Sequence, residues 1–291
     1  MNDEERAYAI LLGLFEGGSR YWSQELDKHG AELLVDRIRS GAYSDTSQAP
    51  MSLAQRFKSL NILEIESQIC ASGALLITPK TANWPECLND LYVPPMSLIV
   101  KGNIDVLGKF EQSISIVGTR KPSSYGMGVA TEFAAGMSGK GWTVVSGGAI
   151  GIDACAHRGA LSIEGCTVAV LGSGVSSLYP STHLKLFREI QENGLLISEV
   201  LPLTKASSPR FLIRNRLIAA LSKGTLVVEA AVRSGSLRTA RDAAEILRQV
   251  MAIPGEITSS TSDGCHRLIA DHTAELVTSV DDLMELVGPL S

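Results

Sequence analysis

The fold is decided by residues 209–241, PRFLIRNRLIAALSKGTLVVEAAVRSGSLRTAR. A helical pattern of apolar and basic residues over 210–221 is followed by the apolar run 225–228. The small-residue turn 233–236 then leads into a second helical pattern over 237–247. A helix, a buried strand and a helix in this order are typical of the crossovers that connect parallel strands.

The same alternation continues on both sides of this stretch. Short apolar runs, several of them unbroken as in strands buried on both faces, alternate with single helical patterns. They predict strands at 113–117, 142–145, 167–171, 195–198, 225–228 and 250–253, and helices at 126–138, 152–163, 182–191, 210–221 and 237–247. After residue 263 we expect a short helix, a strand at 274–277 and a closing helix. The fold class is therefore α/β, an extended Rossmann-like, doubly wound, mostly parallel sheet.

The N-terminal part of the chain has a helical period instead. Apolar residues recur at helical spacing over 4–39 and 53–70. Gly17-Gly18 interrupts the first of these regions, and a second pattern follows over 26–38. The polar, turn-rich segment 42–50 is predicted to be a loop.

Two short apolar runs separate this helical part from the alternating part. Residues 74–78 and 97–100 are bounded by Pro and Gly, and we interpret them as strands. We therefore expect a small helical domain at residues 1–70 and an α/β core at residues 71–291.

Charge is distributed unevenly along the chain. The 291 residues have a formal net charge of −5, yet residues 205–241 contain eight basic residues and one acid, Glu229. An acidic protein that gathers arginines in one segment is expected to bind an anion there. Arg210 and Arg214 are one helical turn apart and share a face, and guanidinium groups match the geometry of phosphates.

The composition indicates a cytoplasmic protein with no disulfide framework. The five cysteines are scattered and form no CxxC pair, which also argues against a zinc site. The acidic N-terminus lacks the basic region of a signal peptide, and no apolar run approaches the roughly 20 residues that span a bilayer. The histidines are dispersed, so we expect no metal site.

In a parallel sheet, ligands bind outside the carboxyl ends of the strands, so the loops there are the candidate sites. Residues 118–126, GTRKPSSYG, contain the cations Arg120 and Lys121, and Ser123 or Ser124 is a candidate cap of the next helix, whose N-terminus favours a phosphate. An ordinary turn with a capping serine is the alternative. In the next loop, Gly147 and Gly148 indicate either a close approach of the backbone to a ligand or a sharp turn.

Other motifs suggest enzymes, but each is incomplete. Residues 172–177 have a GxGxxS pattern, which lacks the third glycine of a dinucleotide fingerprint and supports an oxidoreductase weakly. Asp153 and His157 are four residues apart and suit either acid–base chemistry or a buried structural hydrogen bond. Glu229, at a strand end before a Ser-Gly-Ser turn, suits a nucleotide or nucleoside-phosphate hydrolase of the lysine-decarboxylase-like Rossmann group, although the PGGxGT motif of that group is absent.

Seven segments together resemble the successive motifs of the DNA processing protein A family (DprA, also called Smf). They are GTRKPSSYG (118–126), SGGAIGIDACAH (146–157), LGSGVSSLYP (171–180), ISE (197–199), FLIRNRLIAALS (211–222), VVEAAVRSGSLRTARDAAE (227–245) and PGEITSSTSDGC (254–265). The resemblance implies a non-enzymatic, homodimeric protein of natural transformation that binds single-stranded DNA and loads the RecA recombinase. It implies no cofactor.

The resemblance also implies a set of DNA-binding residues. Arg120 is expected to be a principal contact, Lys185 a further basic contact, and the Arg214-Asn215-Arg216 motif a wall of the pocket. With the loop residues and neighbouring charges, the predicted set is Arg120, Lys121, Ser123, Gly147, Gly148, Lys185, Arg210, Arg214, Asn215, Arg216, Ser234 and Gly235. Glu229 is then interpreted as an internal partner of the arginines, and stacking on bases would use Tyr125, Tyr179 or Phe211.

Some positions depart from the family pattern. Leu212 replaces the usual proline, Ile150 an arginine, His183 and His266 asparagines, and residues 271–273 (Asp-His-Thr) the usual DGA. These departures are expected to alter base contacts more than the fold. The N-terminal helices resemble the sterile-alpha-motif-like domain of the family, and the chain ends where many relatives continue into a winged-helix domain, which we expect to be missing.

Overall fold

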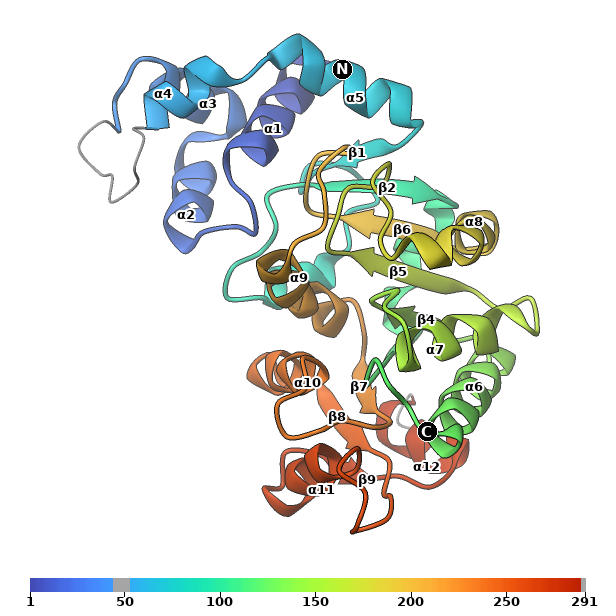
Figure 1. Ribbon diagram of the computed structural model, residues 1–291. Coiled ribbons are helices and arrows are strands. Elements are labelled where there is room, and N and C mark those ends of the chain that lie inside the picture. Colours follow the sequence, from blue (N-terminus) through green and yellow to red (C-terminus); the bar gives the residue numbers. More distant parts are fainter. Residues whose placement is uncertain (44–52, 289–291) are drawn as a thin grey trace.

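The computed structural model describes residues 1–43 and 53–288, and the nine strands in these ranges form one sheet (Figure 1). Their order is β1-β2-β6-β5-β4-β3-β7-β8-β9. All neighbouring pairs from β6 to β9 are parallel, whereas β2 pairs antiparallel with β1 and with β6. The strands are β1 (Leu75–Ile77), β2 (Leu98–Gly102), β3 (Ser113–Val117), β4 (Thr143–Ser146), β5 (Thr167–Leu171), β6 (Leu195–Ser198), β7 (Gly224–Val227), β8 (Gln249–Ala252) and β9 (Glu275–Leu276). The prediction of a mostly parallel α/β sheet is confirmed.

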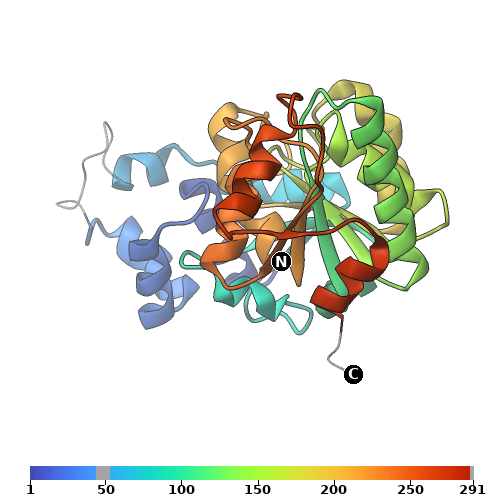
Figure 2. The same cartoon turned by 90° about the horizontal axis from the view of Figure 1, so that it is seen from below.

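Helices cover both faces of the sheet, as Figures 1 and 2 show. One face carries α6 (Ser124–Gly139), α7 (Ile152–Leu161), α8 (Leu184–Asn193) and α12 (Val280–Val287), and the other carries α9 (Ser208–Ala220), α10 (Ser236–Glu245) and α11 (Asp263–Ala270). Buried residues of α6, α7 and α12 form one apolar cluster with the sheet, and those of α9, α10 and α11 form another. The sheet is therefore doubly wound, as predicted.

The strands near the centre of the sheet begin and end where the apolar runs do. β3, β5 and β6 have the predicted bounds, and all their residues are buried. A strand that is buried on both faces consists mainly of apolar residues, so the apolar run marks its length. The strand predicted at 274–277 is shorter in the structure, since β9 covers only two residues.

The N-terminal helices are α1 (Asp3–Leu14), α2 (Arg20–His29), α3 (Ala31–Arg39), α4 (Leu53–Ser59) and α5 (Ile62–Ser72). The pattern over 26–38 spans two of them, because Gly30 with φ 74° ends α2 and precedes α3. Most of the loop predicted at 42–50 lies outside the described residues. These helices have a core of their own, and α1 and α5 share a second cluster with β2, β5 and β6. The domain division at residue 70 stays a prediction, since α5 continues to Ser72.

The chain reverses its direction of travel across the sheet beside β3. It passes from β3 to β4, β5 and β6, and then returns through α9 to β7, on the other side of β3. Two serines of β3 hold α9 in place: Ser113 Oγ donates to the Leu221 carbonyl and Ser115 Oγ to the Ile218 carbonyl, each at 2.7 Å. The end of α9 is thus fixed against the strand at which ligands are expected to bind in this kind of sheet.

Candidate nucleic-acid interface

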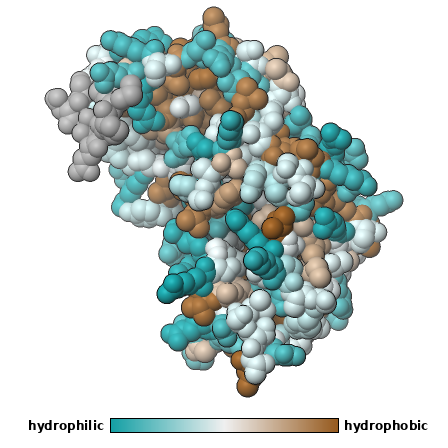
Figure 3. Space-filling view, viewed as in Figure 1, coloured by the Kyte–Doolittle hydropathy of each residue, from teal (hydrophilic) through white to brown (hydrophobic). Residues whose placement is uncertain are grey.

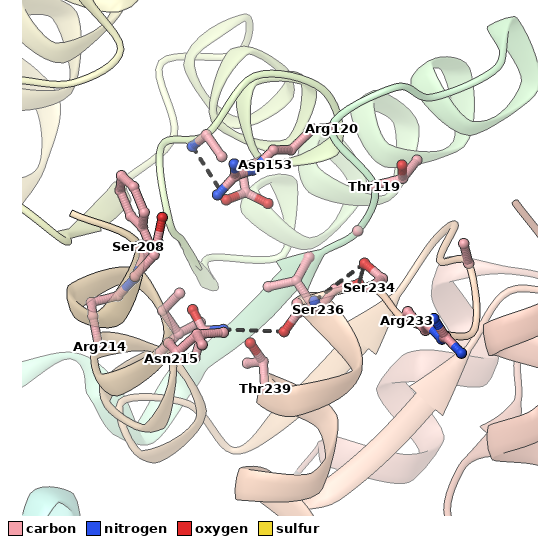
Figure 4. Close-up of a pocket in the computed structure, with 18 of the residues that line it drawn as sticks. Thr119, Arg120, Asp153, Ser208, Arg214, Asn215, Arg233, Ser234, Ser236 and Thr239 are labelled. Atoms are coloured by element: carbon pink, nitrogen blue, oxygen red, sulfur yellow. Dashed lines mark hydrogen bonds between the residues drawn. The ribbon is translucent and has the colours of Figure 1, made fainter. Parts of the chain in front are cut away.

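A cleft of about 690 Å³ opens at this switch point, at the carboxyl ends of β3 and β7. Its walls are the end of β3 with residues 118–121 after it, residues 233–235 after β7, one side of α9 and the start of α10. Figure 4 shows these walls facing one another, with Thr119 and Arg120 on one side and Asn215, Ser236 and Thr239 on the other. The edge of the sheet that the alternation indicated is therefore the edge that carries the cleft.

Exposed cations and aromatic rings lie together in this cleft. Arg120 and Lys121 are exposed in the loop after β3, and Arg233 is exposed in the loop after β7. The Arg120 guanidinium lies over the Phe211 ring, 5.4 Å from its centroid, and the Tyr179 ring lies 5.6 Å from the same ring. Figure 3 shows hydrophilic and hydrophobic residues side by side in the middle of this face. The surface can therefore attract an anion and also contact an apolar ring.

Arg214 belongs to the wall of the cleft and is buried. Its Nη1 donates to the carbonyl of Val170, and Asp153 lies close by. Burial lowers the pKa of Arg214 to about 10, while Asp153 opposes that effect, so the guanidinium stays charged at neutral pH. Burial raises the pKa of Asp153, and Arg214 lowers it. The Arg214 guanidinium thus lies in the wall of the cleft with Asp153 as a nearby counter-charge, so its own positive charge is largely balanced.

Gly147 and Gly148 shape the loop after β4. A Cβ at Gly147 would lie 2.3 Å from Arg214 Nη1, so the backbone passes directly against the buried guanidinium. Gly148 has φ 70°, and a Cβ there would lie 2.6 Å from the Phe187 ring. Both glycines are required by internal packing, and only Gly147 is beside the cleft, where it lines a pocket of about 60 Å³ with Arg120 and Arg214.

Asn215, Ser234 and Gly235 join α9 to the start of α10. Asn215 Nδ2 donates to the Gly235 carbonyl at 3.1 Å, and the hydroxyls of Ser234 and Ser236 are 2.7 Å apart. All of these residues line the cleft.

Two arginines of the predicted set face away from the cleft. Arg210 forms a bidentate pair with Glu16, with nitrogen–oxygen distances of 2.8 and 2.7 Å. Arg216 is half-buried and donates to both carboxylate oxygens of Glu199, at 2.6 and 2.8 Å. The interpretation of Arg216 as a residue on the pocket side is wrong, because α9 turns it towards Glu199 and the carbonyl of Gly17. Both arginines connect α9 to the N-terminal helices.

Lys185 and Ser123 are also outside the cleft. The Lys185 side chain is 90% exposed on α8 and pairs with Glu189 at 3.6 Å. Of the two candidate caps it is Ser123 that caps α6, by accepting from the Gly126 amide at 3.1 Å. Its hydroxyl also donates to Glu229 at 2.6 Å.

Glu229 has different partners from those that the sequence suggested. It accepts from the amide and hydroxyl of Ser123 and from Thr261 Oγ1, and no ion pair between it and an arginine is present in residues 1–43 and 53–288. A Cβ at Gly126 would lie 2.3 Å from Glu229 Oε2. The carboxylate therefore occupies the N-terminus of α6, where a phosphate was expected.

The motifs that suggested an oxidoreductase or acid–base chemistry have structural roles. A Cβ at Gly174 would lie 2.2 Å from the carbonyls of Leu201 and Pro202, so this turn is filled by the chain itself rather than open to a pyrophosphate. His157 Nδ1 lies 2.7 Å from Thr167 Oγ1 instead of pairing with Asp153, and burial lowers the pKa of His157 to about 3.

The departures from the family pattern fall partly at the cleft. Ile150 is 45% exposed and lines the 60 Å³ pocket, and Leu212, 52% exposed, lines the main cleft. His183 is buried, with Nδ1 3.1 Å from the Gly148 carbonyl, and His266 Nε2 lies 3.0 Å from the Gly255 carbonyl.

Sequence reasoning left several polar and charged lining residues out of the predicted set, namely Thr119, Asp153, Ser208, Arg233, Ser236 and Thr239. Arg233 had a usable signal, because it is a basic residue in the loop directly after a predicted strand. Tyr179 and Phe211 were named for stacking and do line the cleft, whereas Tyr125 Oη donates to the carbonyl of Pro254.

Within the described ranges, no group of three or more His, Cys, Asp or Glu residues is placed to hold a metal ion. The helices of the same ranges are all too short or too polar to cross a membrane.

Comparison with known proteins agrees with the motif series. A family model described as DNA recombination-mediator protein A matches residues 75–288. The putative DNA processing protein DprA of Mycobacterium tuberculosis is 38% identical over 295 residues, which cover 97% of this chain and 75% of that protein. DNA processing protein DprA of Streptococcus pneumoniae is 41% identical over 201 residues, 69% of this chain and 70% of that one.

Two solved structures are similar over large parts of the chain. The X-ray structure of DprA from Streptococcus pneumoniae has a TM-score of 0.84 at 31% identity and covers 98% of both chains. A structure describing the single-stranded DNA binding mode of DNA processing protein A from Helicobacter pylori has a TM-score of 0.66 at 28% identity, covering 74% of this chain and 96% of that one. The chain belongs to the DNA recombination-mediator protein A family, whose members carry the names DprA and Smf.

Proposed function

We propose that this protein binds single-stranded DNA in the cleft, protects incoming strands during natural transformation and loads the RecA recombinase onto them as a homodimer. The observation that carries the proposal is that exposed Arg120, Lys121 and Arg233 line one cleft together with the rings of Phe211 and Tyr179, with Arg120 over the Phe211 ring. Cations neutralise phosphates, and aromatic rings stack on bases whatever the sequence. A duplex keeps its base faces stacked inside, so this combination favours a single strand.

The relatives support the same ligand. The Helicobacter pylori protein, with a similar fold over 74% of this chain, is described by its single-stranded DNA binding mode. The cleft lies within residues 75–288, the part of the chain that the family model matches.

The proposed action is not enzymatic. Glu229, the acid on which the hydrolase alternative depends, accepts hydrogen bonds from Ser123 and Thr261 and is not one of the residues that line the cleft. Incubation with nucleoside monophosphates is therefore expected to release no free base, and release of base would contradict this part of the proposal.

DNA binding is tested with an unstructured oligonucleotide and its duplex across a range of salt concentrations. The logarithm of the affinity should fall with the logarithm of salt by about 0.7 for each phosphate neutralised on a single strand. Arg120→Ala should weaken binding and reduce this slope, while Lys28→Ala, which removes an exposed cation on α2, should leave both unchanged. Equal affinity of Arg120→Ala and the parent would show that the cleft is not the binding site.

RecA loading needs a separate assay. On single strands already coated by a single-strand-binding protein, the parent should shorten the delay before RecA filaments form, and Arg120→Ala should not. An unchanged delay with the parent would exclude the loading role without affecting the DNA-binding proposal. Light scattering in solution tests the homodimer.

A further inference from the structure

We propose that Glu229 is a positioning residue for DNA binding: its carboxylate, buried outside the cleft, holds the 119–123 loop so that Arg120 and Lys121 project into the cleft. This inference rests on the proposed function and adds to it a residue that touches no DNA. Glu229 is 3% exposed and lies two residues after β7, which ends at Val227.

The loop is held at both ends by this one residue. At its start, the Thr119 amide donates to the Glu229 carbonyl at 2.6 Å. At its end, the Ser123 amide donates to Oε2 at 2.9 Å and the Ser123 hydroxyl to Oε1 at 2.6 Å. Arg120 and Lys121 lie on the arc between these two attachments, with exposed side chains.

The carboxylate also connects the loop to a third segment. Thr261 Oγ1 donates to Oε1 at 3.3 Å, and the Ala230 amide donates to the Thr261 carbonyl at 2.7 Å. The N-terminus of α6 favours a negative charge at this position, because its first amides point towards it. A single buried anion thus joins the β3–α6 loop, the end of β7 and the 254–262 loop.

The sign of the change in DNA affinity on removal of the Glu229 carboxylate distinguishes two roles of this residue. A carboxylate near a polyanion site repels phosphates, so its removal should strengthen binding if Glu229 acts only through its charge. If it acts by holding the loop, removal should weaken binding, because the free loop must be ordered each time DNA binds.

The experiment measures affinity for a thymidine oligonucleotide. We expect Glu229→Ala to bind about tenfold more weakly, the loss expected when charge-assisted hydrogen bonds are removed. Glu256→Ala, which removes an exposed acid from the neighbouring loop, is the matched charge control and should bind as tightly as the parent or slightly more so. Affinity of Glu229→Ala equal to or above the parent's would overturn the proposal.

A second variant displaces the carboxylate without removing it. A Cβ at Gly126 would lie 2.3 Å from Glu229 Oε2 and 2.5 Å from its Cδ, so Gly126→Ala should push the carboxylate away from Ser123. DNA affinity should then fall in the same way although every charge is kept. If amide exchange at Ser123 became faster in this variant while DNA affinity stayed unchanged, the hydrogen bonds between Glu229 and Ser123 would not govern binding.

Two further measurements separate this inference from the proposed function. Formate should restore part of the affinity of Glu229→Ala relative to chloride at equal ionic strength, because it can occupy the vacated position. Hydrogen exchange of residues 119–123 without DNA should be faster in Glu229→Gln than in the parent. If the parent itself bound no single-stranded DNA, the proposed function would fail. If residues 119–123 exchanged as slowly in Glu229→Gln as in the parent, the positioning role of Glu229 would be rejected instead.

Discussion

Arg216 connects three parts of the fold, and its replacement should therefore affect stability rather than DNA binding. Its Nη2 donates to both carboxylate oxygens of Glu199, at 2.6 and 2.8 Å, and to the carbonyl of Gly17 at 3.2 Å. The two side chains are 13% and 8% exposed. The contacts join α9 to the residue after β6 and to the turn between α1 and α2.

The structure sets the expected magnitude. Arg216→Met keeps the apolar stem but leaves the Glu199 carboxylate buried without its cation, and removing one partner of a buried pair costs about 3–5 kcal/mol. Since domains of this kind are stable by roughly 5–15 kcal/mol, this is a large fraction of the free energy of unfolding. Burial raises the pKa of Glu199 and Arg216 lowers it, so the pKa should rise further in the variant. A carboxyl with a raised folded pKa binds more protons when folded, so the deficit should shrink as the pH is lowered.

Urea denaturation followed by tryptophan fluorescence measures the effect in four proteins: the parent, Arg216→Met, Glu199→Gln and the double variant. The double variant should recover part of the loss of Arg216→Met, because the orphaned charge is gone. The reasoning is refuted if Arg216→Met unfolds at the parent's midpoint and binds single-stranded DNA as weakly as Arg120→Ala does. Arg216 would then be a DNA contact.

Three further outcomes follow from individual contacts. His157 has a pKa of about 3 in the folded protein, so between pH 7 and pH 5 its imidazole takes up a proton only in the unfolded chain. The free energy of unfolding of the parent should therefore fall by about 2 kcal/mol more than that of His157→Gln over this range, as measured by urea denaturation at both pH values. Gly147→Ala should destabilise by about 1–3 kcal/mol because its Cβ would meet Arg214 at 2.3 Å, whereas Gly128→Ala, with nothing within 4 Å, should be neutral or stabilising. Arg210→Ala removes a partly exposed ion pair and should change stability by about 1 kcal/mol or less, with unchanged DNA affinity; a loss matching that of Arg120→Ala would reinstate it as a contact.

The sheet and the position of the cleft could be predicted because their signals are local. Buried runs such as residues 113–117 mark strand ends, and the loops at those ends contain Arg120 and Lys121. Parallel strands bring their carboxyl ends to one edge, so residues over 110 positions apart in the chain, such as Arg120 and Ser234, were expected to meet. The glycines and the motif series also identified the family from the sequence alone.

Only the tertiary structure decided which of the basic residues are exposed in the cleft and which are held in internal ion pairs. Arg214 and Arg216 are two positions apart, so they point about 200° apart around a helix of 3.6 residues per turn. α9 has apolar residues on all sides, and its own pattern does not show which side meets the cleft. The partners of the charges come from distant segments: Glu16 lies 194 residues from Arg210, and Glu229 lies 106 residues from Ser123.

The sequence by itself determined the order and type of the elements, the family and the edge of the sheet that carries the cleft. Hydrophobic periodicity and the loops at strand ends depend on residues that are neighbours in the chain, so they can be predicted without knowledge of the packing. The division of the basic residues into ion-paired and exposed ones was decided only by the tertiary structure. So were the partners of Glu229, which are Ser123 and Thr261 rather than the arginines. The physical reason is that the free energy of a charge depends on what surrounds it, and here the surroundings are assembled from segments far apart in the chain.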